Sequence, residues 1–292
     1  MQKEVVFAII FGSALGLLVA YGVWRTNTTL NNRTQTQDSL IRSEDQQDKV
    51  NDSEPSLGIV TPTNLATITN SPIVITGIAN NLNQILISTD SEDYLIVEPK
   101  NEFSQEIELS GGINEIVVNG FAENAIATSE KMQVAYTTQV DSDEPLRTSL
   151  GVITDITEDY IQMRDSLGEI MQISLLEDTT YANLVGNAKE IDFADLAIGD
   201  FIIAMSKTSQ LEVLEALRVI VTTEPQGLEI TAIKGTVDDY TRNTITIDNK
   251  EYEYDDDTLF MDTNADNADF FLKEGQTVII VAAPILRSVF LI

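Results

Sequence analysis

From residue 57 onward the sequence is a succession of short runs in which apolar and polar residues alternate. Up to residue 139 these runs are PIVITGIA, QILIST, DYLIVEP, EFSQEIEL, NEIVVNGFA and EKMQVAYTT, after an opening GIVTPTN. Turn-forming pairs such as Asn80-Asn81 and Gly111-Gly112 separate them. Period-2 alternation broken by turn residues is typical of an antiparallel sandwich. We therefore predict a β-sandwich over residues 57–139 and a mainly β protein.

One face of each run supplies the predicted core of this sandwich. Side chains two residues apart in a strand lie on the same face of the sheet. The residues predicted to point inward are Ile73, Ile75, Ile85, Ile87, Phe103, Ile107, Leu109, Ile116, Val118, Met132, Val134 and Tyr136.

Three short motifs in this region match the pattern of a known family. Residues 76–79 read T-G-x-A, Asn101-Glu102-Phe103 stands where the family has G-x-F, and residues 112–118 carry its G-x-N-x-I-x-V run. The region resembles the bacterial Ig-like domain of the glucodextranase type. Glu123 and Ala125 replace the usual Asp and Gly of its last loop. The resemblance implies an Ig-like sandwich that acts as a spacer or adhesive module, with no catalytic residue.

Two later stretches, residues 148–223 and 229–292, match each other. The matched positions are Gly151 with Gly235, residues 160–163 with 244–247, Leu196-x-x-Gly199-Asp200 with Leu272-x-x-Gly275-Gln276, and Leu217-Arg218 with Leu286-Arg287. Repetition of this length predicts two copies of one domain. Each copy reads as a hairpin, a strand, a short helical turn ending at glycine, and two more strands. That order predicts two small OB-like or partly open β-barrels.

These copies resemble a family of small exported bacterial β-domains of unknown function. The shared features are the glycine-led opening strand at Gly151 and the D-L-x-x-G-D turn over residues 195–200. The second copy departs from the family with Gln276 in place of Asp. We expect a positive φ at Gly199, which only glycine adopts without cost. The resemblance implies a fold and an exported setting, but no reaction.

Residues 5–24 form a run of twenty residues without a charge. A helix of that length spans about 30 Å, the thickness of the hydrocarbon core of a bilayer. Tyr21 and Trp24 stand where interfacial aromatic residues lie, and Arg25 follows. We predict an uncleaved transmembrane anchor over residues 1–25. The alternative is a cleaved signal peptide, whose nearest small-x-small site is Ala20-Tyr21-Gly22.

Residues 26–56 are rich in Thr, Asn, Gln, Asp and Ser and contain no aromatic residue. Such a segment cannot bury enough apolar surface to offset the entropy of ordering, which predicts a flexible linker. The numbers of basic residues on the two sides of residues 5–24 are nearly equal, so they do not predict which end of the chain lies in the cytoplasm. The β-modules after the anchor are acidic and lack cysteine, which favours an exported body. We expect a single-pass protein of the cell membrane with an extracytoplasmic body.

Small residues recur every four positions on one face of the predicted anchor, at Ala8, Gly12, Gly16 and Ala20. Small residues at this spacing let two helices approach closely in lipid, which favours self-association. The alternative is that small residues are simply common in membrane helices.

The composition narrows the chemistry available to the chain. The formal net charge is −30, with only 17 Lys and Arg residues. A surface that binds nucleic acid has to be basic, so we expect no nucleic-acid partner. There is no histidine and no cysteine. Ser-His and Cys-His nucleophile systems, histidine-ligated zinc and disulfides are therefore excluded. Any catalysis would rest on carboxylates, Lys, Tyr, Ser or Thr.

Two groups of residues are candidate sites. Asp262, Asn264, Asp266 and Asp269 place oxygen ligands near one another and could bind calcium, although Asn267 and Lys273 break the EF-hand pattern. The alternative is a surface loop. Tyr240, Tyr252 and Tyr254 could form a platform for a sugar, or they could pack against the core.

These features lead to an expected function. The sequence predicts a non-catalytic binding, adhesive or spacer ectodomain at the cell envelope, without a cofactor and with an envelope glycan or protein as partner. The alternatives are a carboxylate-dependent glycoside hydrolase, or its carbohydrate-binding accessory protein, and a scaffold of a larger envelope complex.

Overall fold

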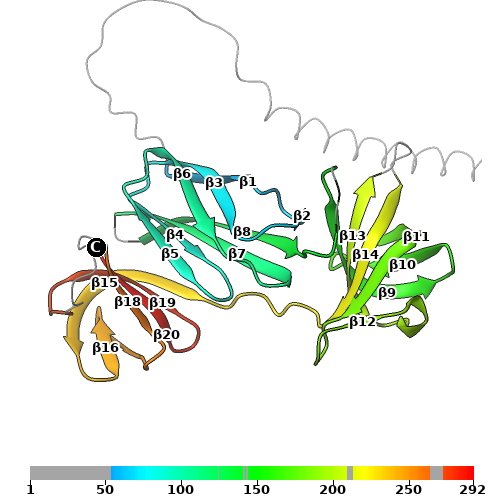
Figure 1. Cartoon of the computed structure of the whole chain (residues 1–292). Helices are drawn as coiled ribbons and strands as arrows, with labels where there is room; N and C mark the ends of the chain where they lie inside the picture. The colour runs from blue at the N-terminus through cyan, green and yellow to red at the C-terminus, as the bar shows by residue number, and fades with distance from the viewer. Residues whose placement is uncertain (1–53, 124, 141, 143, 209–212, 264–271) are drawn as a thin grey trace, which may run out of the picture. The chain divides into compact units, whose positions relative to one another are not determined.

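A computed structural model of the chain describes residues 54–123, 125–140, 142, 144–208, 213–263 and 272–292. Over this part the protein is mainly β, as predicted, with twenty strands and one short 3-10 helix (Figure 1). The predicted anchor and nearly all of the predicted linker lie outside the described residues. No helix among the described residues is long and apolar enough to cross a membrane.

The first module is built from two sheets. One has the order β1-β3-β6, and the other continues as β2-β8-β7-β4-β5. The strands are β1 (Ser56–Thr61), β2 (Ala66–Ile68), β3 (Ile73–Asn80), β4 (Gln84–Ser88), β5 (Asp93–Val97), β6 (Asn101–Ile107), β7 (Gly112–Ala122) and β8 (Ala125–Tyr136). Neighbours pair antiparallel except β2 and β8, which are parallel. The two sheets form the predicted sandwich.

The predicted core of the sandwich is confirmed. All twelve residues predicted to point inward belong to one cluster; ten of them are buried, while Ile73 and Tyr136 are partly buried. Asn101 has a φ of 63°, a left-handed conformation that Asn tolerates better than most residues. It holds the position at which the resembled family has glycine.

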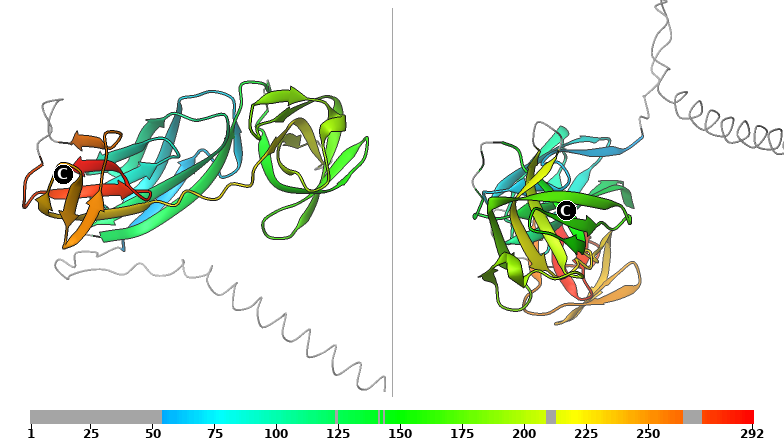
Figure 2. Two further views of the ribbon diagram at one scale, coloured as in Figure 1. Left: turned by 90° about the horizontal axis from the view of Figure 1, so that it is seen from below. Right: turned by 90° about the vertical axis from the view of Figure 1, so that its right-hand side faces the viewer.

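The first barrel copy is a closed sheet. Its elements are β9 (Arg147–Ile156), β10 (Tyr160–Arg164), β11 (Ile170–Asn183), β12 (Lys189–Ile191), η1 (Phe193–Asp195), β13 (Phe201–Thr208) and β14 (Leu214–Thr222). The order β10-β11-β14-β13-β9 closes because β10 also pairs with β9 (Figure 2). β11 runs parallel to β14, and the other pairs are antiparallel.

The second copy repeats this path with one strand divided. Its strands are β15 (Thr231–Tyr240), β16 (Thr244–Ile247), β17 (Lys250–Glu253), β18 (Leu259–Asp262), β19 (Thr277–Ala282) and β20 (Leu286–Leu291), in the order β17-β16-β15-β19-β20-β18. β17 pairs with the second strand of the copy, and β18 runs parallel to the last. Together they take the place of β11.

The glycine turn is the same in both copies. Gly199 and Gly275 have φ values of 99° and 82°, which confirms the conformation predicted for Gly199. The side chain after each glycine caps the turn: Asp200 Oδ2 accepts the Ala197 N–H at 2.8 Å, and Gln276 Oε1 accepts the Lys273 N–H at 2.6 Å. Gln276 therefore caps the turn of the second copy as Asp200 caps that of the first.

A buried threonine also recurs, and the sequence comparison missed it. Thr179 Oγ1 donates to the Ala216 carbonyl at 2.7 Å, and Thr258 Oγ1 donates to the Leu286 carbonyl at 2.7 Å. Each hydroxyl also accepts a backbone N–H from three residues earlier. Because each threonine is buried, its hydroxyl needs both partners. It fixes the place where the third strand of the copy bends.

Strand register corrects one of the sequence matches. Ala216 and Leu286 are equivalent through their threonines, so Arg218 corresponds to Ser288 rather than to Arg287. The same offset follows from β14 and β20, since Val221 and Leu291 occupy equivalent rungs of the two barrels. The match of Leu217-Arg218 with Leu286-Arg287 is wrong by one residue. It aligned similar residue types, whereas the strand pairing aligns Arg218 with Ser288.

Gly151 lies in β9 next to the end of β10, its antiparallel neighbour. A Cβ added at Gly151 would overlap the carbonyl group of Arg164. We expect Gly151→Ala to lower the free energy of unfolding by about 2 kcal/mol, since backbone must move to make room. Urea unfolding measures this. Gly111→Ala is the control, because a Cβ at Gly111 would meet nothing within 4 Å. Equal midpoints for the two variants would contradict the account.

Candidate functional site

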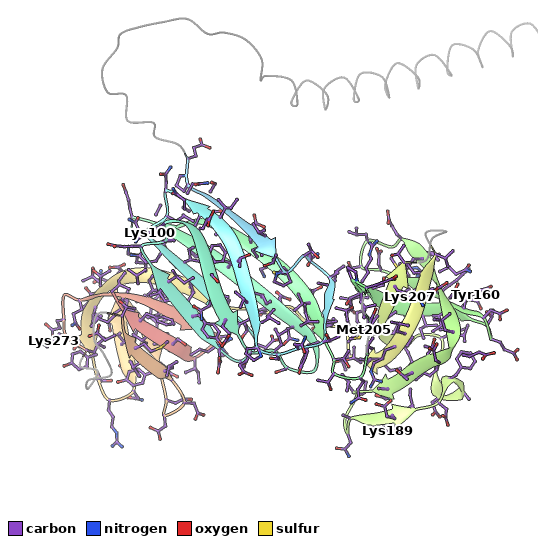
Figure 3. All side chains as sticks on the ribbon, turned by 45° about the horizontal axis from the view of Figure 1, so that its top comes forward. Lys100, Tyr160, Lys189, Met205, Lys207 and Lys273 are labelled. Carbon is purple, nitrogen blue, oxygen red and sulfur yellow. The ribbon has the colours of Figure 1, made fainter. Side chains whose placement is uncertain are left out.

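Each barrel copy buries a second apolar face, on the outside of the barrel, against the sandwich. In the first copy this face consists of Ile203 and Met205 of β13 and Ile220 of β14. They cluster with Ala135 of β8 and with Val140, which follows that strand. Met205 lies on the side of its barrel turned toward the sandwich (Figure 3). These strands are therefore covered on both sides.

The second copy uses the equivalent residues. Register places Ile279, Val281 and Phe290 at the positions of Ile203, Met205 and Ile220. They cluster with Leu86 and Phe121, on the face of the β4-β7 pair that does not point into the sandwich core. One outer barrel face is thus used twice, against two different surfaces of the sandwich.

A buried polar cluster accompanies the second of these contacts. The Asp93 side chain on β5 is 1% exposed. Its Oδ2 accepts a hydrogen bond from Ser288 Oγ at 2.7 Å and lies 3.5 Å from Arg287 Nε. Arg287 also donates to the Thr89 carbonyl at 2.9 Å. These contacts join the β4-β5 turn of the sandwich to the start of β20.

Lys234 makes a second polar link between the same two modules. Its Nζ donates to Gln84 Oε1 at 3.1 Å and to the Glu123 carbonyl. Partial burial lowers the pKa of this lysine below its ordinary value of 10.5. An ammonium group held by two oxygens aligns β15 with the start of β4.

The candidate functional site is a cleft of about 500 Å³ beside this polar cluster. Carboxylates of Glu92, Asp255 and Asp257 line it, together with Asp93 and Arg287 at the module contact. Its remaining walls come from Ser91, Leu259, Ser288 and the turn over residues 283–286. This mixture of carboxylates and apolar side chains suits a ligand that carries positive charge and some apolar surface.

A second cleft, of about 450 Å³, lies between the sandwich and the segment that follows β14. Asp90 and Glu115 line it on the sandwich side, and residues 222, 223 and 225–228 line it opposite. The Glu115 carboxylate lies 3.6 Å from Lys131 Nζ. Although Asp90 as a residue is exposed, burial of its carboxyl raises the pKa above the ordinary value of 3.8.

The predicted calcium ligands remain a prediction. Asp262 ends β18, while Asn264, Asp266 and Asp269 lie outside the described residues. Among the residues that the structure does describe, no group of three or more carboxylates is placed to hold a metal ion.

Two of the three tyrosines pack against the barrel core. Tyr252 and Tyr254 are partly buried there, and the ring of Tyr254 meets that of Phe260 edge-on at 5.1 Å. Tyr254 also donates its hydroxyl to the Thr241 carbonyl at 2.7 Å. Tyr240 is 44% exposed. The structure therefore favours the packing alternative for Tyr252 and Tyr254.

Comparison with family models and with curated proteins gave no match. Sequence reasoning could not bring Asp93 and Ser288 together, since they are 195 positions apart and neither stands in a motif.

Removal of the Asp93 carboxylate should weaken the contact between the second barrel and the sandwich. We expect Asp93→Ala to lower the free energy of unfolding by about 2–3 kcal/mol, because it leaves the buried Ser288 hydroxyl without its acceptor and the Arg287 guanidinium without its carboxylate. Glu106→Ala, which removes an exposed carboxylate from the other sheet, should change it by less than about 0.5 kcal/mol. Urea unfolding of both variants checks this, and similar losses would contradict it.

The pKa of Asp90 predicts a pH effect with a definite sign. A raised pKa means that the folded state binds the proton more tightly than the unfolded state. The stability from this group is present below pH 3.8 and is lost as pH rises through the raised pKa. Asp90→Asn should therefore unfold at higher urea than the native protein at pH 7, and the gain should vanish in acid. Glu106→Gln is the control. A gain that persists in acid would contradict the assignment.

Proposed function

We propose that the chain is a membrane-anchored, extracytoplasmic protein whose β-modules form a non-catalytic binding ectodomain at the cell envelope. The observation that carries this proposal is the repeated use of one outer barrel face against the sandwich. Interfaces with a buried apolar centre and paired polar groups hold modules in a fixed geometry. A fixed geometry is what a protein needs to present a cleft at a distance from a surface.

Charge supports a binding role for the cleft beside Asp93. Glu92, Asp255 and Asp257 line it, and Arg287 is the one basic residue among the described residues that form its walls. The same carboxylates would be needed by the alternative, a glycoside hydrolase, which requires two of them held on either side of a sugar. A glycan array followed by a hydrolysis assay separates the two, since a binding protein releases no product.

The anchoring part of the proposal rests on residues 5–24. We expect the full chain to stay with the membrane fraction after carbonate washing, and external protease to remove the body from intact cells. Leu17→Arg, which puts a charge in the middle of the run, should release a large fraction of the protein from the membrane.

Leu40→Arg, the same change within the predicted linker, is the matched control and should leave the protein in the membrane fraction. Recovery of the native protein as a freely soluble species, or of a chain that begins after Gly22, would overturn the anchor.

A further inference from the structure

The two barrel copies differ at one hairpin. In the first copy, β13 and β14 continue for two rungs past Ser206 and Ala216, pairing Lys207 with Glu215 and Thr208 with Leu214. Lys207 lies at this end of its barrel (Figure 3). In the second copy the equivalent hairpin ends at the rung of Ala282 and Leu286. The chain then reverses through residues 283–285, where the Ala283 N–H donates to the Ile285 carbonyl at 2.8 Å.

The extra rungs complete the first barrel. Leu214 and Glu215 pair in parallel with Ile173 and Ser174 of β11, so that part of β11 has a partner strand on each edge. Leu214 packs against the barrel core. Glu215 lies on the surface, and its carboxylate is 3.6 Å from Lys207 Nζ.

The second copy lacks this strand. Tyr252 and Glu253 are the equivalents of Ile173 and Ser174, since they occupy the same rungs opposite the second strand of their copy. Within the described part of the chain, β17 pairs with β16 alone. Ile173 is fully buried, whereas Tyr252 is only partly buried. One edge of β17 is therefore open where the first copy holds Leu214 and Glu215.

The backbone groups of Glu253 point toward this open edge. The Tyr254 N–H donates to the Asn243 carbonyl at 2.9 Å, so Tyr254 faces β16. Residues alternate in the direction of their backbone groups along a strand, which turns Glu253 the other way. The first copy has the equivalent hydrogen bond, from the Leu175 N–H to the Asp159 carbonyl at 2.8 Å. By the same alternation, the backbone groups of Ser174 point toward β14.

The surroundings of the edge indicate the ligand. Glu251 and Glu253 are exposed on β17, and three aspartates follow at residues 255–257. Asp255 and the turn at residues 283–286 also line the 500 Å³ cleft, so the cleft opens beside the vacant rungs. A strand in this place would put alternate side chains against Tyr252 and the others beside these carboxylates.

We propose that the free edge of β17 binds an extended segment of a partner polypeptide, running parallel to β17, in which apolar and basic residues alternate. The segment takes the place that Leu214 and Glu215 hold in the first copy, and adds a strand to the sheet through backbone hydrogen bonds. The proposal names the ligand class of the binding role proposed above and rests on it. It does not depend on the membrane anchor, whose test has a separate outcome.

The test uses the full chain in detergent and a labelled peptide, KVLKALK. The peptide copies residues 213–217 with the glutamate replaced by lysine and a lysine added at each end. Fluorescence anisotropy should show saturable binding that weakens as salt rises. A peptide with N-methyl groups at alternate backbone nitrogens has the same side chains but cannot pair as a strand. Its affinity should be at least tenfold lower, and equal affinity would overturn the proposal.

Two protein variants locate the site. Glu253→Pro removes an N–H that makes no hydrogen bond to β16. The fold should survive, because proline is tolerated on edge strands. It should weaken binding at least tenfold, whereas Glu253→Ala, which keeps the N–H, should bind within about threefold of the native protein. Unchanged binding by Glu253→Pro would overturn the proposal.

Grafting residues 207–215 in place of residues 283–285 gives the second barrel the hairpin of the first. The graft fills the edge from within the chain and should abolish binding, and binding by a folded graft would contradict the proposed location. Self-association of the native protein that Glu253→Pro removes would show that a second copy supplies the strand, and would overturn the assignment to a separate partner.

Discussion

The last two strands of each barrel copy are apolar on both faces, and this constraint shapes the described structure. A small barrel can cover only the inward face of such strands. The outward face, represented by Met205 in one copy and Phe290 in the other, has to be buried by something else. The sandwich provides that cover twice, with its β7-β8 region for the first copy and its β4-β7 pair for the second. The modules are therefore bound to one another by the same apolar requirement that forms their cores.

The two barrel copies share one strand order but differ at one hairpin, and this difference underlies the separate binding role that we propose for the second copy. The first copy closes its sheet with residues that the second copy lacks, while the turn, the buried threonine and the outer face remain the same in both. Loss of two rungs leaves the core of the second copy intact because Tyr252 and Tyr254 cover it. Among the described residues it leaves one edge of β17 without a partner strand, next to a cleft whose walls come from both the sandwich and the second barrel. The proposed binding site thus lies at the end of the second barrel that contacts the sandwich at Asp93.

Much of this architecture could be predicted from the sequence, and the failures have physical causes. Period-2 alternation identified Ile85 and Ile87 as core residues because each alternates with a residue on the other face of β4. The same rule could not identify Leu86, which is equally buried, since its face is covered by another module 190 and more positions away. Arg218 was matched to the wrong residue because similar side chains do not show how two strands are aligned within their sheets. Asp93 and Arg287 carry no local signal, since only folding brings them together.

The central claim is that the sandwich and the second barrel are held as one body by the cluster around Phe121 and Phe290. Hydrogen exchange of the native protein across a urea series tests it most directly, because exchange reports the unfolding of each segment separately. We predict that the amides of β4 and β7 and those of β19 and β20 lose protection at one urea concentration. We also predict that Phe290→Asp divides this into two transitions. Loss of protection in β19 and β20 of the native protein while β4 and β7 stay fully protected would contradict the account.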